Sequence, residues 1–354
     1  MTDEPVVPEG PAGSENDWVT LLKDNARTGG LGAPALPAPS KARWQARVGG
    51  PIRTAPVLRE GTLYVGASRG ELQAMQTDTG RVRWKFKAGG QIHSTPALSG
   101  KLVLFGCDDG KVYAVNAESG TRVWEAATSG EIWASPVVRQ GTVFIGSADG
   151  HMYAVDVTTG KFRWKVDLAG RVYATVYAAE KRVYVGCGDG QAHCLDAANG
   201  KILWSMRTGN GIDSSAALVG DTLLFGSQDF FVYALDASSG AVRWKYETGL
   251  GISSSPAVSG DVAVIGGKDG FLYALEVSTG KLRWKVRAGE VLTGPAVFGE
   301  SIIYLQSWGL LALDPKDGKV LWRAGLGTGV QHAPVISGKT MYLTAGDGDV
   351  YALE

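Results

Sequence analysis

The sequence predicts an all-β protein, a single eight-bladed β-propeller, from a repeated motif and its spacing. The motif, seen as LDAANGKILW at residues 195–204, is written seven times along the chain. Its tryptophans and one that precedes them recur every forty residues, with a last step of thirty-eight; they are Trp44, Trp84, Trp124, Trp164, Trp204, Trp244, Trp284 and Trp322. A fixed period of roughly 40–50 residues, filled with short strands, is typical of propeller blades.

Each repeat is expected to form four antiparallel strands. In the second repeat, the strand-like segments are residues 91–99, 101–107, 111–117 and 121–127, and turn residues separate them. Asp-Gly pairs such as 109–110 supply the positive φ that a two-residue hairpin needs. A glycine in each motif serves the turn between the third and fourth strands, and the aspartate four residues earlier is expected to cap it.

The eight tryptophans have a structural interpretation. Each lies on a fourth strand, where a large flat ring fills the wedge that widens outward between neighbouring blades. Burying one such ring contributes about 2–3 kcal/mol by area. We therefore interpret these residues as a structural girdle and not as a binding site.

Counting the first strands shows how the ring closes. They are expected to start near Ile52, Ile92, Ile132, Val172, Ile212, Ile252, Val291 and Val330. The chain ends in the third strand of the eighth blade, so residues 41–48 are predicted to supply its fourth strand and to remove the free sheet edges. The domain prediction is a disordered tail at 1–16, a segment at 17–40 that docks on the propeller, and one propeller domain at 41–354.

Composition excludes several classes of partner. Lys+Arg 35 balances Asp+Glu 35, so neither nucleic acid nor an anionic membrane is indicated. No apolar run is long enough to span a bilayer. The N-terminus has no basic start or apolar segment of the kind found in signal peptides. As written, the chain is expected to be cytoplasmic; with a leader removed, it would be periplasmic or otherwise extracytoplasmic.

Residue types give no catalytic, metal or cofactor site. The three cysteines form no CxxC pair, and the four histidines lie in different repeats, so neither a zinc site nor a nucleophile–base pair is predicted. His193 replaces a repeat tyrosine and is expected in the core. The hairpin aspartates could be read as Ca²⁺ ligands, but one carboxylate per blade is spread too widely for that, so we assign them to turns; they are Asp109, Asp149, Asp189, Asp229, Asp269 and Asp347.

The repeats, of the form YAxDxxTGKxxW, resemble the PQQ-like β-propeller repeat family over roughly residues 41–354. Its members include quinoprotein alcohol dehydrogenases, the assembly lipoprotein BamB and sensor domains of bacterial kinases. In the dehydrogenases, the resemblance implies a quinone over the propeller axis, between a Trp and a vicinal disulfide, with Ca²⁺ and a catalytic Asp. This chain has no adjacent cysteines and lacks the long insertions that cover the cofactor in those enzymes. Trp133 or Asp213 could take such roles, but nothing in their local sequence indicates it. The non-enzymatic, BamB-like branch without a cofactor is therefore favoured.

One position in the first strands differs in chemistry from repeat to repeat while its neighbours stay uniform. It reads Arg53, His93, Trp133, Tyr173, Asp213, Ser253, Leu292 and Gln331. Innermost strands begin near the axis, so these side chains are expected around the mouth of the central channel. We interpret Arg53, His93, Trp133, Tyr173, Asp213 and Gln331 as a binding ring; the alternative is ordinary variation where packing is loose.

The hairpins between second and third strands depart from the repeat in three consecutive blades. They are expected to present Phe230, Phe231, Phe271 and Trp308 on the same face as the ring. Aromatic clusters on a rim are typical of protein interfaces, although these side chains could instead pack on neighbouring blades or hold residues 17–32. The predicted function is a non-catalytic, monomeric scaffold that binds a protein or peptide within a larger assembly. The alternative is a small-ligand sensor or a PQQ-dependent dehydrogenase-like protein that uses the central channel.

Overall fold

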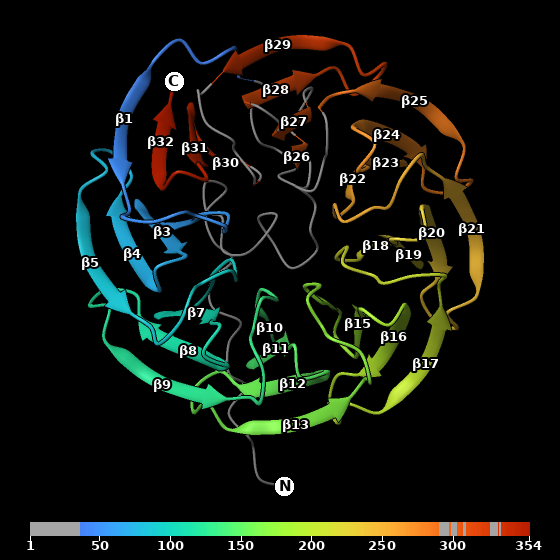
Figure 1. Ribbon diagram of the computed structural model, residues 1–354, viewed down its shortest axis with the longest axis horizontal. Coiled ribbons are helices and arrows are strands. Elements are labelled where there is room, and N and C mark those ends of the chain that lie inside the picture. The colour runs from blue at the N-terminus through green and yellow to red at the C-terminus, as the bar shows by residue number, and fades with distance from the viewer. Residues whose placement is uncertain (1–35, 290–296, 299–302, 307–308, 326–331, 333) are drawn as a thin grey trace, which may run out of the picture.

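The computed structural model describes residues 36–289, 297–298, 303–306, 309–325, 332 and 334–354. In this part of the chain the regular structure consists of eight four-stranded antiparallel sheets. The sheets surround a central axis as the blades of a propeller (Figure 1). The predicted all-β, eight-bladed fold is therefore confirmed.

Within each blade, the strands run in order from the axis to the circumference. The innermost strands are β2 (Val57–Arg59), β6 (Ala97–Ser99), β10 (Val137–Arg139), β14 (Tyr177–Ala178), β18 (Ala217–Val219), β22 (Ala257–Ser259), β26 (Val297–Phe298) and β30 (Val335–Ser337). The second strands are β3 (Thr62–Ala67), β7 (Leu102–Gly106), β11 (Thr142–Gly146), β15 (Arg182–Gly186), β19 (Thr222–Gly226), β23 (Val262–Gly266), β27 (Ile303–Gln306) and β31 (Thr340–Thr344).

The third and fourth strands are longer than the innermost strands. The third strands are β4 (Glu71–Gln76), β8 (Lys111–Asn116), β12 (His151–Asp156), β16 (Gln191–Asp196), β20 (Phe231–Asp236), β24 (Phe271–Glu276), β28 (Gly309–Leu313) and β32 (Asp349–Leu353). The fourth strands are β5 (Val82–Lys87), β9 (Arg122–Ala127), β13 (Phe162–Asp167), β17 (Ile202–Arg207), β21 (Val242–Glu247), β25 (Leu282–Arg287), β29 (Val320–Gly325) and β1 (Ala42–Arg47). Figure 1 shows these last strands forming the circumference.

The eighth blade is completed by the N-terminal strand, as predicted. β1 pairs antiparallel with β32, with Trp44 opposite Ala352 and Gln45 opposite Tyr351. The Gln45 side chain also donates to the Asp349 carboxylate over 2.8 Å. The ring is therefore closed by strands from the two ends of the described chain.

The innermost strands begin later than predicted. The first starts at Val57 and not near Ile52, and the delay is five residues in every blade except the seventh, where β26 starts six residues after Val291. Pro56 has no N–H to donate to a sheet, and the N–H of Ala55 donates instead to the Thr95 hydroxyl of the next blade (3.1 Å). Because these groups serve inter-blade contacts or cannot pair, residues 52–56 lie outside the sheet.

The hairpins between second and third strands have three residues and not two, apart from that of blade 7, which falls partly outside the described residues. In the second blade, the Cys107 N–H pairs with the Lys111 carbonyl (3.1 Å) and the Gly110 N–H with the Cys107 carbonyl (3.1 Å). Of the two residues in the Asp-Gly pair, only Gly110 has a positive φ, 77°. This is a type I turn followed by one left-handed residue, so only one position of each such hairpin favours glycine.

The tryptophans hold neighbouring blades together through specific contacts. Trp164 donates its indole N–H to the Ala197 carbonyl in the next blade (3.0 Å). Its ring lies against Gly200, where an added Cβ would stand 2.7 Å from the ring. Asp196 caps the same turn by accepting the Ala198 N–H (2.9 Å). The predicted capping role of this aspartate is confirmed, and the indole has a hydrogen-bonding role in addition to filling a wedge.

Candidate functional site at one face of the propeller

The variable ring position projects from an otherwise buried segment. Ile52 and Thr54 are buried, whereas Arg53 between them is exposed. The same alternation leaves Trp133 and Asp213 exposed, and His93 and Tyr173 half-buried. Gln331 lies outside the described residues. The position that varies between repeats is therefore the accessible one, and the uniform positions beside it are buried.

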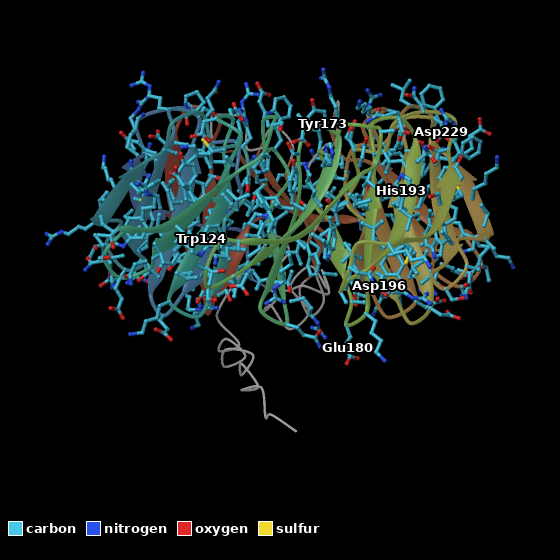
Figure 2. The ribbon with its side chains drawn as sticks, turned by 90° about the horizontal axis from the view of Figure 1, so that it is seen from below. Trp124, Tyr173, Glu180, His193, Asp196 and Asp229 are labelled. Carbon is cyan, nitrogen blue, oxygen red and sulfur yellow. The ribbon has the colours of Figure 1, made fainter. Side chains whose placement is uncertain are left out.

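The two predicted features share a face of the molecule. Figure 2 shows Tyr173 of the ring and Asp229 of a hairpin on the upper face, and Glu180 and Asp196 on the opposite face. We call the face with Tyr173 and Asp229 the tip face, and the face with Glu180 and Asp196 the turn face. The tip face is where the predicted ring and hairpins meet.

Three ring residues form a continuous aromatic cluster. The Trp133 ring stacks on Tyr173 with centroids 4.9 Å apart, and His93 lies 5.2 Å from Trp133 on the blade before. His93 Nε2 is also 3.2 Å from Asp108 Oδ2. Burial raises the pKa of Asp108, while His93 opposes that shift. Blades 2, 3 and 4 thus present a joined aromatic and acidic surface.

A second cluster lies across blades 5 and 6. Gln228 donates to the Asp213 carboxylate (2.8 Å) and to the Ser253 hydroxyl (2.8 Å), and it accepts from Lys268 (2.8 Å). Sequence reasoning missed this contribution, because it considered only the ring position. The residue two positions before the left-handed hairpin residue also varies between repeats, and that variation was the available signal; it reads Ser68, Asp108, Ala148, Gly188, Gln228 and Lys268.

The hairpin tip of blade 5 carries the clearest departure. Phe230 occupies the glycine position of the turn with a φ of 77° and is 45% exposed. Leu250, on the adjoining loop, is 47% exposed. The Thr248 hydroxyl donates to the carbonyls of both residues, each over 2.8 Å, so the two lie together.

The frame around this pair is unchanged from other blades. In blades 2 and 3, the Thr128 hydroxyl makes the same two bonds to Gly110 and Gly130. Two glycines of the repeat are therefore replaced by two exposed apolar side chains in blades 5 and 6. Neither substitution is required by the backbone, since the glycine version forms the same contacts.

The other predicted tip aromatics differ in exposure. Phe231 and Phe271 are the first residues of β20 and β24 and are half-buried. Lys245 lies 4.3 Å from the Phe231 ring centroid, and Lys285 lies 5.3 Å from that of Phe271. Trp308 falls outside the described residues. Among the described tip aromatics, Phe230 is therefore the most exposed.

The described residues do not reproduce the quinone pattern implied by the dehydrogenases. The free cysteines Cys107, Cys187 and Cys194 are buried in separate positions, and burial raises the pKa of Cys107 to about 12. In the described ranges, no three His, Cys, Asp or Glu side chains are grouped to hold a metal ion. Since these residues do not fit the cofactor, we derive no chemistry through it. His193 is buried, as expected.

Fold and repeat together define the class of protein: a PQQ-like propeller whose blades are joined by tryptophan contacts. More specifically, the chain belongs to the family described as outer membrane protein assembly factor BamB, whose model matches residues 33–135, 108–253, 232–308 and 291–354. No curated protein matches the chain significantly. In the described part of the chain, no helix has the length and apolar character needed to cross a membrane.

Solved structures share the fold at low sequence identity. BamB from Moraxella catarrhalis is 18% identical, with a TM-score of 0.77 over 89% of this chain and 99% of that one. The quinohemoprotein alcohol dehydrogenase from Comamonas testosteroni is 17% identical, with a TM-score of 0.83 over 97% and 81%. A related enzyme from Pseudomonas putida is 15% identical, with 0.82 over 96% and 79%. At this identity the likeness concerns fold alone, and it includes enzymes as well as BamB.

Proposed function

We propose that this protein is a non-catalytic scaffold that binds a protein partner through its tip face. Phe230 and Leu250 are the anchor of that interface, and the surrounding ring provides its polar rim. The matched family is described as an outer membrane protein assembly factor, and a role in holding a component of an assembly is of the same kind.

The single observation that carries this proposal is the conformation of Phe230. A non-glycine residue at a φ of 77° is strained, and left-handed backbone costs roughly 1–2 kcal/mol outside glycine. The ring recovers little of that cost by burial, because it is 45% exposed. Strained residues of this kind concentrate at functional positions, and aromatic side chains dominate protein-interface energies.

Lysines near these rings suggest the chemistry of the partner. Lys245 and Lys285 lie over Phe231 and Phe271, and Lys268 is held in the polar cluster beside them. A lysine held over an aromatic face keeps its positive charge, so it can also attract a carboxylate of a bound partner. We therefore expect a partner segment that combines an apolar side chain with acidic residues.

Site-specific photocrosslinking in the source cells tests the proposal. A benzophenone amino acid replaces Phe230 in one variant and Leu250 in another. The matched control replaces Leu203, which is 45% exposed on the outer strand β17. We expect the same protein adduct from the first two variants and not from the third. No adduct at 230 and 250, or the same adduct at all three positions, would contradict the proposal.

A direct binding measurement completes this test. Once the adduct partner is identified, Phe230→Gly with Leu250→Gly should weaken its binding at least tenfold, because both anchors are removed while the turn keeps its glycine form. The alternative of a PQQ-dependent protein is tested separately by adding PQQ and Ca²⁺: a bound cofactor would raise the melting temperature, and we expect no change.

A further inference from the structure

On the tip face, the ring residues of blades 4 and 5 flank a position that has no side chain. In blades 1 to 6, one hairpin residue lies beside the ring residue of its blade, because its N–H donates to the carbonyl two positions before that residue. In blade 4 the hairpin residue is Gly188, whose N–H donates to the Arg171 carbonyl (2.8 Å), two positions before Tyr173. The other five blades have a side chain at this position: Ser68, Asp108, Ala148, Gln228 and Lys268.

Neighbouring ring residues are linked on both sides of this junction. In blade 5, Gln228 joins Asp213 to Ser253 of blade 6, with both bonds 2.8 Å long. Between blades 3 and 4, Trp133 and Tyr173 contact each other directly, with ring centroids 4.9 Å apart. Between Tyr173 and Asp213, no hydrogen bond, ion pair or ring contact is formed within the described residues.

The backbone does not require glycine at this position. Gly188 does not have the positive φ that favours glycine. A Cβ added there would meet its nearest atom, the Arg171 carbonyl oxygen, at 3.4 Å and the Arg171 Cβ at 3.8 Å. These are ordinary van der Waals distances, so a side chain would fit. We call the space over Gly188, between Tyr173 and Asp213, the interblade slot.

The two sides of the interblade slot differ in chemistry. One face of the Tyr173 ring is stacked on Trp133 of blade 3. Since blades 3, 4 and 5 follow one another around the ring, the other face is turned toward blade 5. Arg171 donates to the Tyr173 hydroxyl (3.1 Å) and so holds the ring by its edge.

Asp213 provides the opposite side of the interblade slot. It is exposed, and Gln228 donates to its Oδ2 atom. Within the described residues, its Oδ1 atom accepts no hydrogen bond and is available to a ligand. The interblade slot therefore combines an aromatic face with an accessible carboxylate.

We propose that the interblade slot binds a guanidinium group, that of an arginine side chain in the partner held by the tip face. A guanidinium is planar and positively charged, so it can stack on Tyr173 and donate to the Asp213 carboxylate at the same time. An ammonium group has the charge without the plane. This inference rests on the proposed function and adds an arginine to the apolar and acidic partner residues expected at blades 5 and 6.

The test uses ¹⁹F NMR of the full-length protein with 3-fluorotyrosine at position 173 alone. The probes are the N-acetyl amides of arginine, lysine and citrulline; the ureido group of citrulline is planar and uncharged. The charge of Arg171 opposes a second cation, so a free arginine derivative should bind weakly. It should nevertheless shift the signal saturably, at concentrations at least threefold lower than either other probe. Equal binding of citrulline or lysine, or no saturable shift, would overturn the proposal.

Variants at position 188 show whether the space itself is the site. Gly188→Gln supplies the side chain that blade 5 has at Gln228 and should abolish the shift, because it fills the interblade slot. Gly188→Ala is the matched control and should bind within twofold of the original protein, since its Cβ fits and blade 3 has Ala148 there. Binding retained in Gly188→Gln, or lost equally in both variants, would contradict the assignment.

Asp213→Asn tests the carboxylate. This variant should bind the arginine derivative no more tightly than the original protein binds the citrulline derivative, because only stacking and neutral hydrogen bonds are left. Unchanged arginine binding would remove Asp213 from the site. The readout does not involve the partner, so this assignment and the crosslinking test at Phe230 and Leu250 can fail separately.

Discussion

At the scale of single residues, each girdle tryptophan performs two tasks that no smaller ring can combine. Trp164 covers Gly200 of the next blade and donates to the Ala197 carbonyl. Gly200 has a φ of 76° and no room for a Cβ beneath the indole. The pair is therefore a matched unit, in which a large residue on one blade requires the smallest on the next.

Trp164→Phe should lower the free energy of unfolding by about 2 kcal/mol, because it removes the indole hydrogen bond and part of the buried area. Urea unfolding followed by circular dichroism measures the change. Trp133→Phe is the control and should cost less than about 0.5 kcal/mol, since Trp133 is 42% exposed and outside the girdle. Similar losses in both variants would refute the distinction between girdle and ring.

His193 makes stability depend on pH. Burial lowers its pKa below the ordinary value of 6.5, so the unfolded chain takes up a proton that the folded chain does not. This contribution to stability is therefore complete above pH 6.5 and falls as the pH drops below it, by at most about 1.4 kcal/mol per pH unit.

His193→Tyr restores the repeat residue, which in blade 3 donates from Tyr153 to Asp149 (2.6 Å). We expect the variant to gain stability over the original protein progressively as the pH falls from 7.5 to 5. Thermal unfolding at several pH values measures that difference. A difference that stays constant with pH would contradict the assignment of His193.

At the scale of elements, the hairpin of blade 5 contains a residue, Phe230, that the fold does not need and that we assign to partner binding. Its frame is that of the other blades, and Phe230 adds strain to it. Phe230→Gly should therefore leave the free energy of unfolding unchanged or raise it by up to about 1 kcal/mol, with relief of strain offset by greater freedom of the unfolded chain. Chemical unfolding measures the effect. A loss above about 1 kcal/mol would mean that the ring is needed for packing.

The repeat motif predicted the elements well for a physical reason. Its Asp, Gly and Trp encode local turns and contacts with the adjacent blade, which recur unchanged, so counting them located even the split eighth blade. The first strands were misplaced because the Ala55 N–H donates to the next blade and Pro56 has no N–H to pair. Alternation within a strand does not reveal the first of these effects.

The candidate sites were predictable only where repeats disagree at one aligned position. That comparison identified Trp133 and Phe230. The comparison did not predict a cavity between blades 3 and 4 on the turn face. Its lining residues Arg139, Arg163 and Lys181 come from different repeat positions and meet only in the folded ring.

At the scale of the whole molecule, hydrogen bonds between equivalent positions link the blades near the axis. The Thr95 N–H donates to the Ser135 hydroxyl (3.0 Å), and the Ser135 N–H donates to Thr175 (3.2 Å). The series continues through Ser215 to Ser255. Each of these hydrogen bonds joins residues forty positions apart, so each blade positions the next one. The ring is complete only when the first and last strands of the described chain also pair, and that pairing is not covalent.

That junction is the pairing of β1 with β32, and a disulfide between their facing residues tests its register. Gln45 lies opposite Tyr351, whereas Ala352 is paired with Trp44. Gln45→Cys with Tyr351→Cys should form a disulfide on oxidation, because facing residues project to the same side of the sheet. Closing so long a loop should raise the free energy of unfolding by on the order of 4 kcal/mol. Non-reducing electrophoresis and urea unfolding measure both effects.

The control shifts one partner by a single residue. In Gln45→Cys with Ala352→Cys the two side chains project to opposite faces of the strand pair, so no disulfide should form. The native Cys107, Cys187 and Cys194 are buried and free, and they should not compete for the new thiols. Crosslinking in the shifted pair and not in the facing pair would place β1 in another register, and the eighth blade would then close differently from the other seven.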